Sequence, residues 1–412
     1  MNVLFIGLEQ INNVSDRGLY TDFLREVIKN GHSLTVISAN EKRNRNACKG
    51  SYYYEGVHYL FAKTGNITKN SNFLSKGMSI VLAGWQYLFT LKREVQNYDL
   101  VICTTPCITF ERAMRYAKRR GNGKCVLLLK DLWPYDLLFD NVLTKIGWKG
   151  IVYKYLEKIS LRLFDASDVI GCMTPKNKQF LESVYNNGMP LDRAIIIPNS
   201  IEPLKYCPTK SELIELRIKN NIPIEKTVFV YGGNLGMAQG PEFIIDAIKY
   251  SATENEKVFF LIVGNGTDYQ RIHNALEQFD NVRCIPALPR NEYEHLVYAC
   301  DVGLVFLNWN CHSPNVPSRI LQYMQAGLPV LCATDDTTDI GEIVCKNGFG
   351  LSCQSNSVSD FNNCIKKMMD SEIRGKMGVA ARAFIESEYS AHRTYSLIFE
   401  SYLGEKDEII RS

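Results

Sequence analysis

Short apolar runs recur along the whole chain, and amphipathic stretches fill most of the gaps between them. Apolar runs that alternate with helical patterns predict a parallel β-sheet covered by helices on both faces. The pattern occurs twice. In the first half the predicted strands are Val3–Gly7, Ser33–Ser38, His58–Phe61, Leu100–Cys103, Cys125–Leu129, Val169–Cys172 and Ala194–Ile197. In the second half they are Thr227–Tyr231, Val258–Val263, Val282–Ile285, Val302–Phe306, Val330–Ala333 and Gly350–Cys353.

Helical patterns complete the two α/β halves. The clearest predicted helices are Leu19–Lys29, Ile108–Arg119, Ile151–Leu163 and Asn177–Tyr185. A chain of 412 residues is too long for one ordinary hydrophobic core. We therefore expect two Rossmann-like, doubly wound parallel-sheet domains, residues 1–200 and 201–387, which face a central cleft and are joined by the polar stretch Pro198–Lys226. Residues 388–412 are expected to form a helix that packs back on the first domain.

The composition is that of a folded intracellular protein. Apolar residues make up 46% of the chain, and no segment is of low complexity. The chain starts directly with an apolar strand pattern and shows no secretory leader. Its most membrane-like stretch, Gly77–Leu91, is shorter than the about 20 residues that a spanning helix needs. The 13 cysteines are scattered and fit buried thiols, so we expect a cytoplasmic protein without a metal site or a disulfide framework.

Net charge is divided unevenly between the halves. Residues 1–200 contain 27 Lys and Arg against 17 Asp and Glu, whereas residues 201–412 contain 20 against 27. A basic half suggests an anionic partner, but no basic-aromatic motif of nucleic-acid binding occurs. Basic residues flank or interleave two apolar stretches, Gly77–Leu91 and Lys145–Lys158. They predict peripheral binding to the anionic inner face of the cell membrane, and the alternative is an incidental distribution of charge on solvated helices.

A helix start in the second half is suited to bind an anion. Pro317 and Ser318 open a predicted helix that ends at Gly327, directly after the buried strand pattern Val302–Phe306. A helix N-terminus at the carboxyl end of a parallel strand presents free N–H groups, and Arg319 adds a full positive charge. The alternative is an ordinary βαβ unit with a solvated arginine.

Two glycine-rich turns follow earlier strands of the same half. One turn holds Gly233, Asn234 and Gly236, and the other holds Gly264 and Gly266. Glycines let backbone N–H groups approach a phosphate closely. Together with the helix start, these turns predict a nucleoside-diphosphate crevice. The G-x-G-x-x-G fingerprint is absent from both halves, which argues against a dehydrogenase, and no Walker loop, H-E-x-x-H or G-x-S-x-G motif occurs.

Five ordered motifs carry a family resemblance over nearly the whole chain. They are Gly31-His32, Lys130-Asp131-Leu132-Trp133-Pro134, Pro198-Asn199-Ser200-Ile201-Glu202, the Gly233–Gly240 turn, and Val316-Pro317-Ser318-Arg319 with Ala326-Gly327-Leu328-Pro329-Val330. With them the chain resembles family 4 (group 1) glycosyltransferases of the GT-B fold, in the bacterial branch that builds O-antigen, capsule and exopolysaccharide. The resemblance implies a nucleotide-diphosphate sugar donor bound by the second domain and a saccharide acceptor, polyprenyl-diphosphate-linked, bound by the first. It also implies retention at the anomeric carbon, hexosyl or N-acetylhexosaminyl transfer, and no cofactor or obligatory metal.

The donor side departs from the wider family at four positions. Pro314 and Gln322 stand where the family has two glutamates, and Asn234 and Gln239 stand where it has Arg and Lys. Gln322 can still bond a ribose hydroxyl, more weakly than a carboxylate would. The diphosphate is then left to Arg319 and backbone amides. The candidate donor-binding residues are Gly233, Asn234, Gly236, Gln239, Gly264, Gly266, Arg319 and Gln322.

Candidate residues on the acceptor side follow strands of the first half. Asp131 orients or deprotonates an acceptor hydroxyl, or else caps the next helix. Lys130, where the wider family often has His, contacts a phosphate or simply extends from the strand end. Trp133 offers a stacking face for a sugar or packs the loop. The resemblance adds Arg17 and Gly18 in the first loop, so Asp131 and Lys130 are the catalytic candidates and the other three belong to the acceptor side.

The sequence favours transfer of a sugar to a growing lipid-linked saccharide. Two other functions fit the same twin-domain form. One is a sugar-nucleotide epimerase, which would turn over its nucleotide sugar without an acceptor. The other is a non-catalytic subunit that binds a nucleotide sugar, which the four departures on the donor side motivate.

Overall fold

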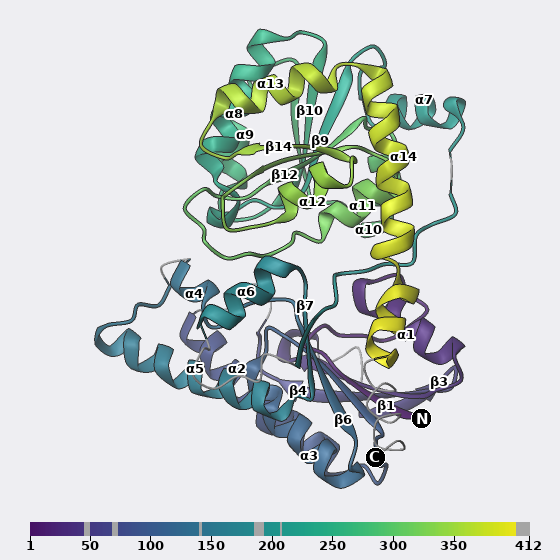
Figure 1. The fold of residues 1–412 in the computed structure, drawn as a ribbon, viewed down its shortest axis with the longest axis vertical. Helices are drawn as coiled ribbons and strands as arrows, with labels where there is room; N and C mark the ends of the chain where they lie inside the picture. Colours follow the sequence, from purple (N-terminus) through teal and green to yellow (C-terminus); the bar gives the residue numbers. More distant parts are fainter. Residues whose placement is uncertain (45–49, 68–72, 140–141, 185–192, 207, 401–412) are drawn as a thin grey trace. The chain divides into compact units, whose positions relative to one another are not determined.

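The structure of the chain is a computed structural model, and it describes residues 1–44, 50–67, 73–139, 142–184, 193–206 and 208–400 (Figure 1). The chain divides into two compact units. Unit 1 comprises Met1–Glu202 together with the C-terminal segment from Ala391, and unit 2 comprises Pro203–Ser390. Each unit is a β-sheet with helices packed on it; the sheet of unit 2 is wholly parallel, and that of unit 1 is parallel except for one edge strand.

Unit 1 is built on an eight-stranded sheet in the order β3-β4-β2-β1-β5-β6-β7-β8. The strands are β1 (Asn2–Ile6), β2 (Ser33–Glu41), β3 (Ser51–Tyr54), β4 (Val57–Thr64), β5 (Leu100–Thr104), β6 (Lys124–Leu129), β7 (Val169–Cys172) and β8 (Ala194–Ile196). The strands pair in parallel except for β3, which runs antiparallel to β4 at the edge. The strand order reverses between β1 and β5, so the carboxyl ends of these two strands border a switch-point crevice.

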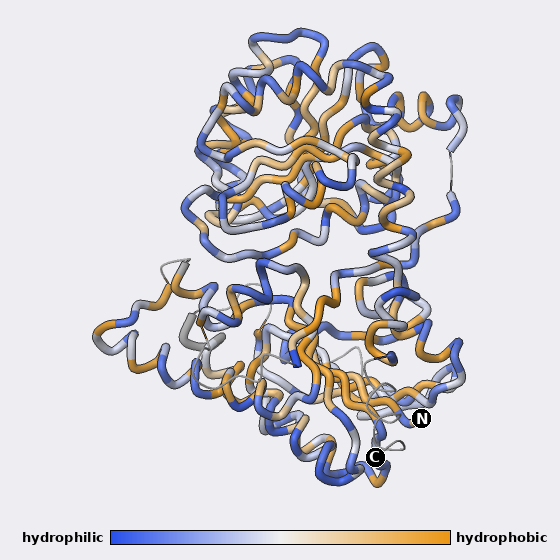
Figure 2. The backbone as a smooth tube through the Cα atoms, in the orientation of Figure 1, coloured by the Kyte–Doolittle hydropathy of each residue, from blue (hydrophilic) through white to orange (hydrophobic). Residues whose placement is uncertain are grey.

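Helices cover both faces of this sheet. They are α1 (Leu19–Lys29), α2 (Phe73–Leu91), α3 (Glu111–Gly121), α4 (Asp136–Phe139), α5 (Gly147–Ala166) and α6 (Pro175–Val184), with 3-10 turns η1 (Lys42–Asn44) and η2 (Ile108–Phe110). Because side chains of a strand alternate between faces, Leu4 and Ile6 join the core beneath α2, α3 and α5. Val3 and Phe5 join a second core with α1. Segments of hydrophobic residues run through the middle of the sheet (Figure 2).

The C-terminal segment of the described chain belongs to unit 1. Residues 391–400 are helical. The His32 ring stacks on Phe399 at 4.7 Å between centroids, and the His392 ring nitrogen Nδ1 lies 3.1 Å from the Glu26 carboxylate. The expected helix over 388–412 extends past residue 400, beyond the described residues.

Unit 2 is built on a six-stranded parallel sheet in the order β11-β10-β9-β12-β13-β14. The strands are β9 (Thr227–Asn234), β10 (Val258–Asn265), β11 (Val282–Pro286), β12 (Val302–Phe306), β13 (Val330–Thr334) and β14 (Gly350–Gln354). The helices are α7 (Lys210–Lys219), η4 (Met237–Gln239), α8 (Pro241–Glu254), α9 (Tyr269–Leu276), α10 (Arg290–Tyr298), α11 (Arg319–Gln325), α12 (Ile340–Lys346), α13 (Val358–Met368) and α14 (Ser371–Glu388). Here the order reverses between β9 and β12.

The α/β fold predicted from the sequence is confirmed, with two differences. The edge strand β3 was not predicted. The stretch Pro198–Lys226, expected as a polar connection, contains α7, whose first turn is closed by a capping box between Thr209 and Glu212. Tyr185, the expected last residue of the Asn177–Tyr185 helix, lies outside the described residues. None of the described helices is long and apolar enough to cross a membrane.

Candidate active site

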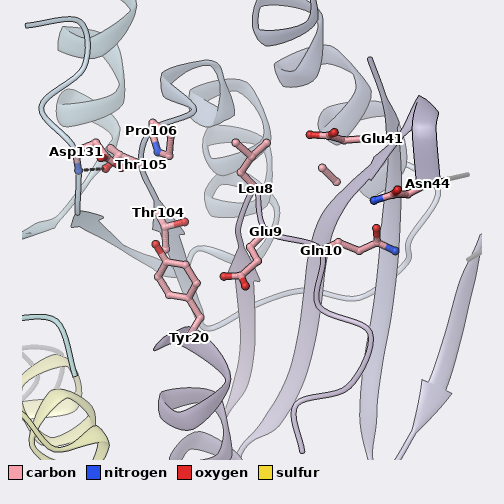
Figure 3. Close-up of a pocket in the computed structure, with 11 residues that line it drawn as sticks. Leu8, Glu9, Gln10, Tyr20, Glu41, Asn44, Thr104, Thr105, Pro106 and Asp131 are labelled. Atoms are coloured by element: carbon pink, nitrogen blue, oxygen red, sulfur yellow. Dashed lines mark hydrogen bonds between the residues drawn. The ribbon is translucent and has the colours of Figure 1, made fainter. Parts of the chain in front are cut away.

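Unit 1 has a pocket of about 440 Å³ at its switch point (Figure 3). The pocket lies at the carboxyl ends of β1, β2, β5 and β6. Its lining residues are Leu8, Glu9, Gln10, Tyr20, Ala39, Glu41, Asn44, Thr104, Thr105, Pro106 and Asp131. Crevices at the carboxyl ends of parallel strands are where ligands bind in doubly wound sheets. This pocket is therefore the candidate acceptor site.

Asp131 follows β6, and its side chain lines this pocket. Its backbone N–H donates to the Thr105 hydroxyl at 2.9 Å, which fixes the turn. The cap of the next segment comes from Asp136, whose carboxylate accepts from the Leu132 N–H at 2.9 Å. Burial, and next the charge of Asp136, raise the pKa of Asp131 to about 6, while Lys130 opposes the shift. A half-buried carboxylate that titrates near neutrality suits a base or an orienting group.

Lys130 does not line the pocket. Its ammonium donates to the carbonyls of Pro198 at 3.2 Å and Ile197 at 3.4 Å. Burial lowers the pKa of Lys130 to about 7, so a positive charge at this position is weakly held. The side chain ties the end of β6 to the segment after β8.

Three residues expected on the acceptor side also lie outside the pocket lining. Trp133 packs against the core of unit 1, and its carbonyl accepts from the Ser160 hydroxyl at 2.9 Å. The Arg17 guanidinium donates to the Glu202 carbonyl at 3.1 Å. The Gly18 N–H donates to the Asp22 carboxylate at 3.0 Å, at the N-terminus of α1. These contacts stabilise the loops around the site.

Tyr20 and Glu9 are pocket residues that the sequence did not single out. The Tyr20 hydroxyl hydrogen-bonds Thr104, and its pKa is raised by burial first and then by the charges of Asp131 and Glu9. Glu9 follows β1 in the first βα turn, where the sequence showed only that a dinucleotide fingerprint is absent. A polar residue directly after the first strand of a doubly wound sheet is the signal that could have identified it.

In unit 2, Arg319 meets the glycine turn after β9. Its guanidinium carbon lies 4.2 Å from the centroid of the Tyr231 ring. Gly233 has φ of +131°, and a Cβ there would lie 3.1 Å from Nη2 of Arg319. A Cβ at Gly264, after β10, would lie 2.0 Å from the Gly233 carbonyl oxygen. Only glycine fits this turn, which brings backbone and a fixed cation together at the second switch point.

Tyrosines connect the turn to α11. The Gly232 N–H donates to the Tyr323 hydroxyl at 3.1 Å, and that hydroxyl donates to the Leu304 carbonyl at 3.2 Å. Tyr323 is fully buried. The helix that carries Arg319 is thus locked to β9 and β12 by one side chain.

The departures from the family change this site in a defined way. The Asn234 amide donates to Oε1 of Gln239 at 3.1 Å, and the Gly236 N–H donates to the same oxygen at 3.1 Å. With the Gln322 amide in the orientation that satisfies both of its atoms, its nitrogen donates to the carbonyls of Arg319 at 3.1 Å and Ser318 at 3.2 Å. The neutral amides of Asn234 and Gln239 therefore stabilise the turn at the positions where the wider family has cations. Gly266 has φ of +145°, and its Cβ would lie 2.2 Å from the Leu235 carbonyl oxygen.

The acidic loop before α12 does not gather into a metal centre. The Asp335 carboxylate accepts from the N–H groups of Thr337 and Thr338 at 2.7 and 2.9 Å. Across the described ranges of the chain, no group of three or more His, Cys, Asp or Glu is arranged to hold a metal ion.

Comparison with known proteins gives a family match within unit 2. Residues 214–384, nearly all of unit 2, match the family described as glycosyl transferases group 1. This match covers the glycine turns and the Arg319 helix. Most of unit 2 is thus similar to group 1 glycosyltransferases, the family that the sequence motifs resemble.

Curated relatives and a solved structure extend the likeness to both units. The chain is 26% identical over 333 residues to "Probable glycosyltransferase WbjE" of Pseudomonas aeruginosa, which is 79% of each chain. It is 22% identical over 357 residues to "Putative colanic acid biosynthesis glycosyl transferase WcaI" of Escherichia coli (strain K12), 83% of this chain and 86% of the relative. The crystal structure of Anabaena Alr3699/HepE in complex with UDP has the same fold, with a TM-score of 0.67, 15% identity, and coverage of 98% of this chain and 100% of that one.

Proposed function

We propose that the chain transfers a hexose or N-acetylhexosamine from a nucleotide-diphosphate sugar to a lipid-linked saccharide, with retention at the anomeric carbon and without an obligatory metal. The proposal assigns the donor to unit 2 and the acceptor to unit 1. The observation that carries it is the Arg319 guanidinium, held 4.2 Å over the Tyr231 ring beside a turn that only glycine can form. The relative in colanic acid biosynthesis supports a role in surface polysaccharide synthesis.

Stabilisation of the leaving group is the main catalytic task of unit 2. As the glycosidic bond breaks, negative charge builds on the nucleoside diphosphate. Arg319 and the N–H groups of the glycine turns meet that charge without rearranging, and a well-placed donor of this kind contributes about 3–4 kcal/mol. Because the Anabaena structure holds UDP, a uridine diphosphate sugar is the first donor to test.

In unit 1, Asp131 orients the acceptor hydroxyl. The hydroxyl attacks the anomeric carbon from the side of the leaving group, the bond from that carbon to the diphosphate oxygen breaks, and a donor phosphate oxygen takes the hydroxyl proton. A retaining transferase of this type does not need the carboxylate pair of a glycosidase. With its pKa near 6, Asp131 is mostly ionised at pH 7.5 and can accept a hydrogen bond from the hydroxyl.

The experiment is a transfer assay with the full chain. UDP-glucose, UDP-galactose, UDP-N-acetylglucosamine and GDP-mannose are each supplied with polyprenyl-diphosphate-linked monosaccharides, with and without EDTA, and the products are analysed by mass spectrometry and by NMR of the anomeric proton. We expect one donor to be used, with its anomeric configuration kept and with EDTA having no effect. An inverted product or an EDTA-sensitive rate would contradict the mechanism.

A second function has one observation in its favour. The Asn234–Gln239 pair stands where the wider family has two cations, which is compatible with a subunit that binds a nucleotide sugar without transferring it. Transfer or donor hydrolysis by the isolated chain would exclude this alternative.

We also propose that unit 1 contacts an anionic membrane surface, where a polyprenyl-linked acceptor is anchored. Four large apolar side chains of α2 are 44–62% exposed at the helical spacing of one face: Met78, Leu82, Trp85 and Phe89. Arg112 lies over the Trp85 ring at 4.6 Å, and Lys92 lies over the Phe89 ring at 6.0 Å. On α5, Trp148 is 63% exposed, Ile151 72% and Tyr155 49%. Apolar side chains with adjacent cations suit the headgroup layer.

A further inference from the structure

Two thiols of unit 2 lie in contact at the outer edge of its sheet. Cys353 is on β14, the edge strand, and Cys364 is on α13, the helix that follows it. Both side chains are half-buried and pack against the core cluster that residues of α8 and α13 help to form. The two thiols share a hydrogen bond, and Sγ of Cys364 also donates to the Ser352 carbonyl at 3.9 Å.

This contact makes the two thiols chemically unequal. The hydrogen bond from Cys353 lowers the pKa of the Cys364 thiol, and burial opposes this shift. Of the two nearby charges, Lys367 lowers the pKa of Cys364 further and Asp360 raises it. The same hydrogen bond, and next burial, raise the pKa of Cys353. Because the thiolate is the reactive form of cysteine, Cys364 is the nucleophile of the pair and Cys353 is the thiol in place to react with it.

Three other cysteines of unit 2 hold their protons more firmly. Cys284 is half-buried on β11, at the opposite edge of the sheet, and burial raises its pKa to about 11. Cys300 and Cys332 are buried, and burial raises the pKa of both thiols. Oxidation should therefore begin at Cys364 and not at these sites.

We propose that Cys353 and Cys364 form a redox-sensitive dithiol, which a peroxide oxidises to a disulfide that ties β14 to α13. The Cys364 thiolate attacks one oxygen of hydrogen peroxide and becomes a sulfenic acid, and the hydroxide that leaves takes up the former thiol proton to form water. The Cys353 sulfur then attacks the Cys364 sulfur, the S–O bond breaks, and a second water leaves with the Cys353 proton. The two thiols lose two electrons and two protons, and the peroxide is reduced to two waters. This site goes beyond the proposed function and does not depend on where donor and acceptor bind.

The disulfide would fix the edge of the sheet to the helix beside it. β14 is the last strand of the sheet and pairs with β13 on one side. Closing the short loop from Cys353 to Cys364 stabilises the fold mainly by constraining the unfolded chain. One turn before Cys364, the Phe361 ring lies 5.6 Å from the Phe306 ring of β12, so the tied helix also supports the core of unit 2.

The test is peptide mapping of the full chain after oxidation. Trypsin cleaves after Lys346 and Lys366, so a single peptide, residues 347–366, contains both cysteines and no third one. The chain is reduced, freed of reductant, treated with an equivalent of hydrogen peroxide, alkylated with iodoacetamide and digested. We expect this peptide to be unalkylated and lighter by two hydrogens than the reduced peptide. Dithiothreitol should restore two thiols that can be alkylated.

Thermal unfolding gives a second measurement. Oxidation should raise the melting temperature of the wild-type chain by about 3–10 °C. Cys353→Ser should remove both the lighter peptide and this rise. The matched control is Cys284→Ser, which changes the half-buried cysteine at the opposite edge of the same sheet and should keep both.

Full alkylation of the 347–366 peptide after oxidation would overturn the inference, as would a cross-link from Cys364 to Cys345, the exposed thiol on α12. A melting temperature that oxidation leaves unchanged in wild type, or raises equally in Cys353→Ser, would overturn it as well. If Cys353→Ser does not fold, the peptide map and the melting temperature of the wild-type chain decide.

Discussion

At the scale of single residues, Asp131 is the side chain on which the chemistry should depend most. Its carboxylate lines the pocket of unit 1, whereas the donor turn belongs to unit 2. We expect Asp131→Asn to lower the transfer rate by about 10²–10⁴-fold, the usual contribution of an acid–base or orienting group. Calorimetry should show UDP affinity within about twofold of wild type. A variant that keeps more than half of the wild-type rate would show that Asp131 only shapes the loop.

The same substitution should stabilise the fold at neutral pH. The folded chain raises the pKa of Asp131 to about 6, above the value of about 4 for an unfolded chain, so the ionised form is disfavoured on folding. The protonated Asp131 carboxyl contributes its full stabilisation of the folded wild-type chain below pH 4. This contribution is lost as the pH rises through 6. The free energy of unfolding of Asp131→Asn should therefore be about 1–3 kcal/mol higher than that of wild type at pH 7.5. Denaturant titrations should show that this gain in the free energy of unfolding vanishes at pH 4. A gain of equal size at both pH values would show that the raised pKa of Asp131 is not its cause.

Arg319 is the corresponding residue for the donor. It is the cation that stacks on Tyr231 beside the glycine turn. We expect Arg319→Ala to weaken UDP binding by about 1.5–3 kcal/mol, the range for a hydrogen bond to a charged group. Arg271→Ala removes a half-exposed arginine of the same unit, paired with Glu242, and should leave UDP affinity unchanged. Equal effects of the two variants in calorimetry would remove Arg319 from the site.

The sequence predicted some of these residues and not others, for physical reasons. Arg319 and the glycines could be proposed from the sequence, because a helix start and a tight turn each follow from local residue types. Lys130 stays a predicted catalytic residue, but no sequence pattern indicated that its ammonium, just after the end of β6, donates to the carbonyls of Ile197 and Pro198. Tyr20 enters the pocket from the start of α1, and only the tertiary fold brings it to the Thr104 hydroxyl.

At the scale of elements, the strands were the most predictable part. All thirteen expected strands form, because a buried parallel strand is a continuous apolar run. The missed strand β3 is short, largely exposed and antiparallel at the edge, and its Ser-Tyr-Tyr-Tyr sequence carries no buried face. The missed helix α7 has no buried residue, and its capping box marks it more clearly than its weak apolar pattern.

The glycine turns of unit 2 make an element-scale prediction. A Cβ at Gly264 would lie 2.0 Å from the backbone carbonyl oxygen of Gly233, whereas a Cβ at Gly375, inside α14, meets no atom within 4 Å. Gly264→Ala should lower the free energy of unfolding by about 1–3 kcal/mol. Gly375→Ala should raise it by up to about 1 kcal/mol, because alanine favours an exposed helix. Denaturant titrations of both variants check the pair, and a neutral Gly264→Ala would show that the two strand ends can separate freely.

At the scale of the whole molecule, the alternation of strands and helices predicted the fold class. The charge counts predict that unit 1 is the part that binds an anionic surface. The surface itself depends on which faces of α2 and α5 pack inward. Tyr153 and Leu156, which the sequence placed in the basic segment, are buried in the core, whereas Trp148 and Tyr155 remain exposed. Both helices pack on the same core cluster of unit 1, so their exposed sides belong to one face of its sheet.

That face gives the last prediction. Lys154 and Lys158 are exposed on α5 next to its apolar residues, and each basic residue near an anionic surface contributes about 1 kcal/mol. At low salt the chain should co-sediment with vesicles that contain phosphatidylglycerol and much less with neutral phosphatidylcholine vesicles. Lys154→Glu with Lys158→Glu should abolish most of this binding, while the same change at Lys210 and Lys219 on α7 of unit 2 should reduce it only slightly. Equal loss from the two double variants would mean that net charge alone drives the attraction, and equal binding to both kinds of vesicle would leave a soluble acceptor as the better candidate.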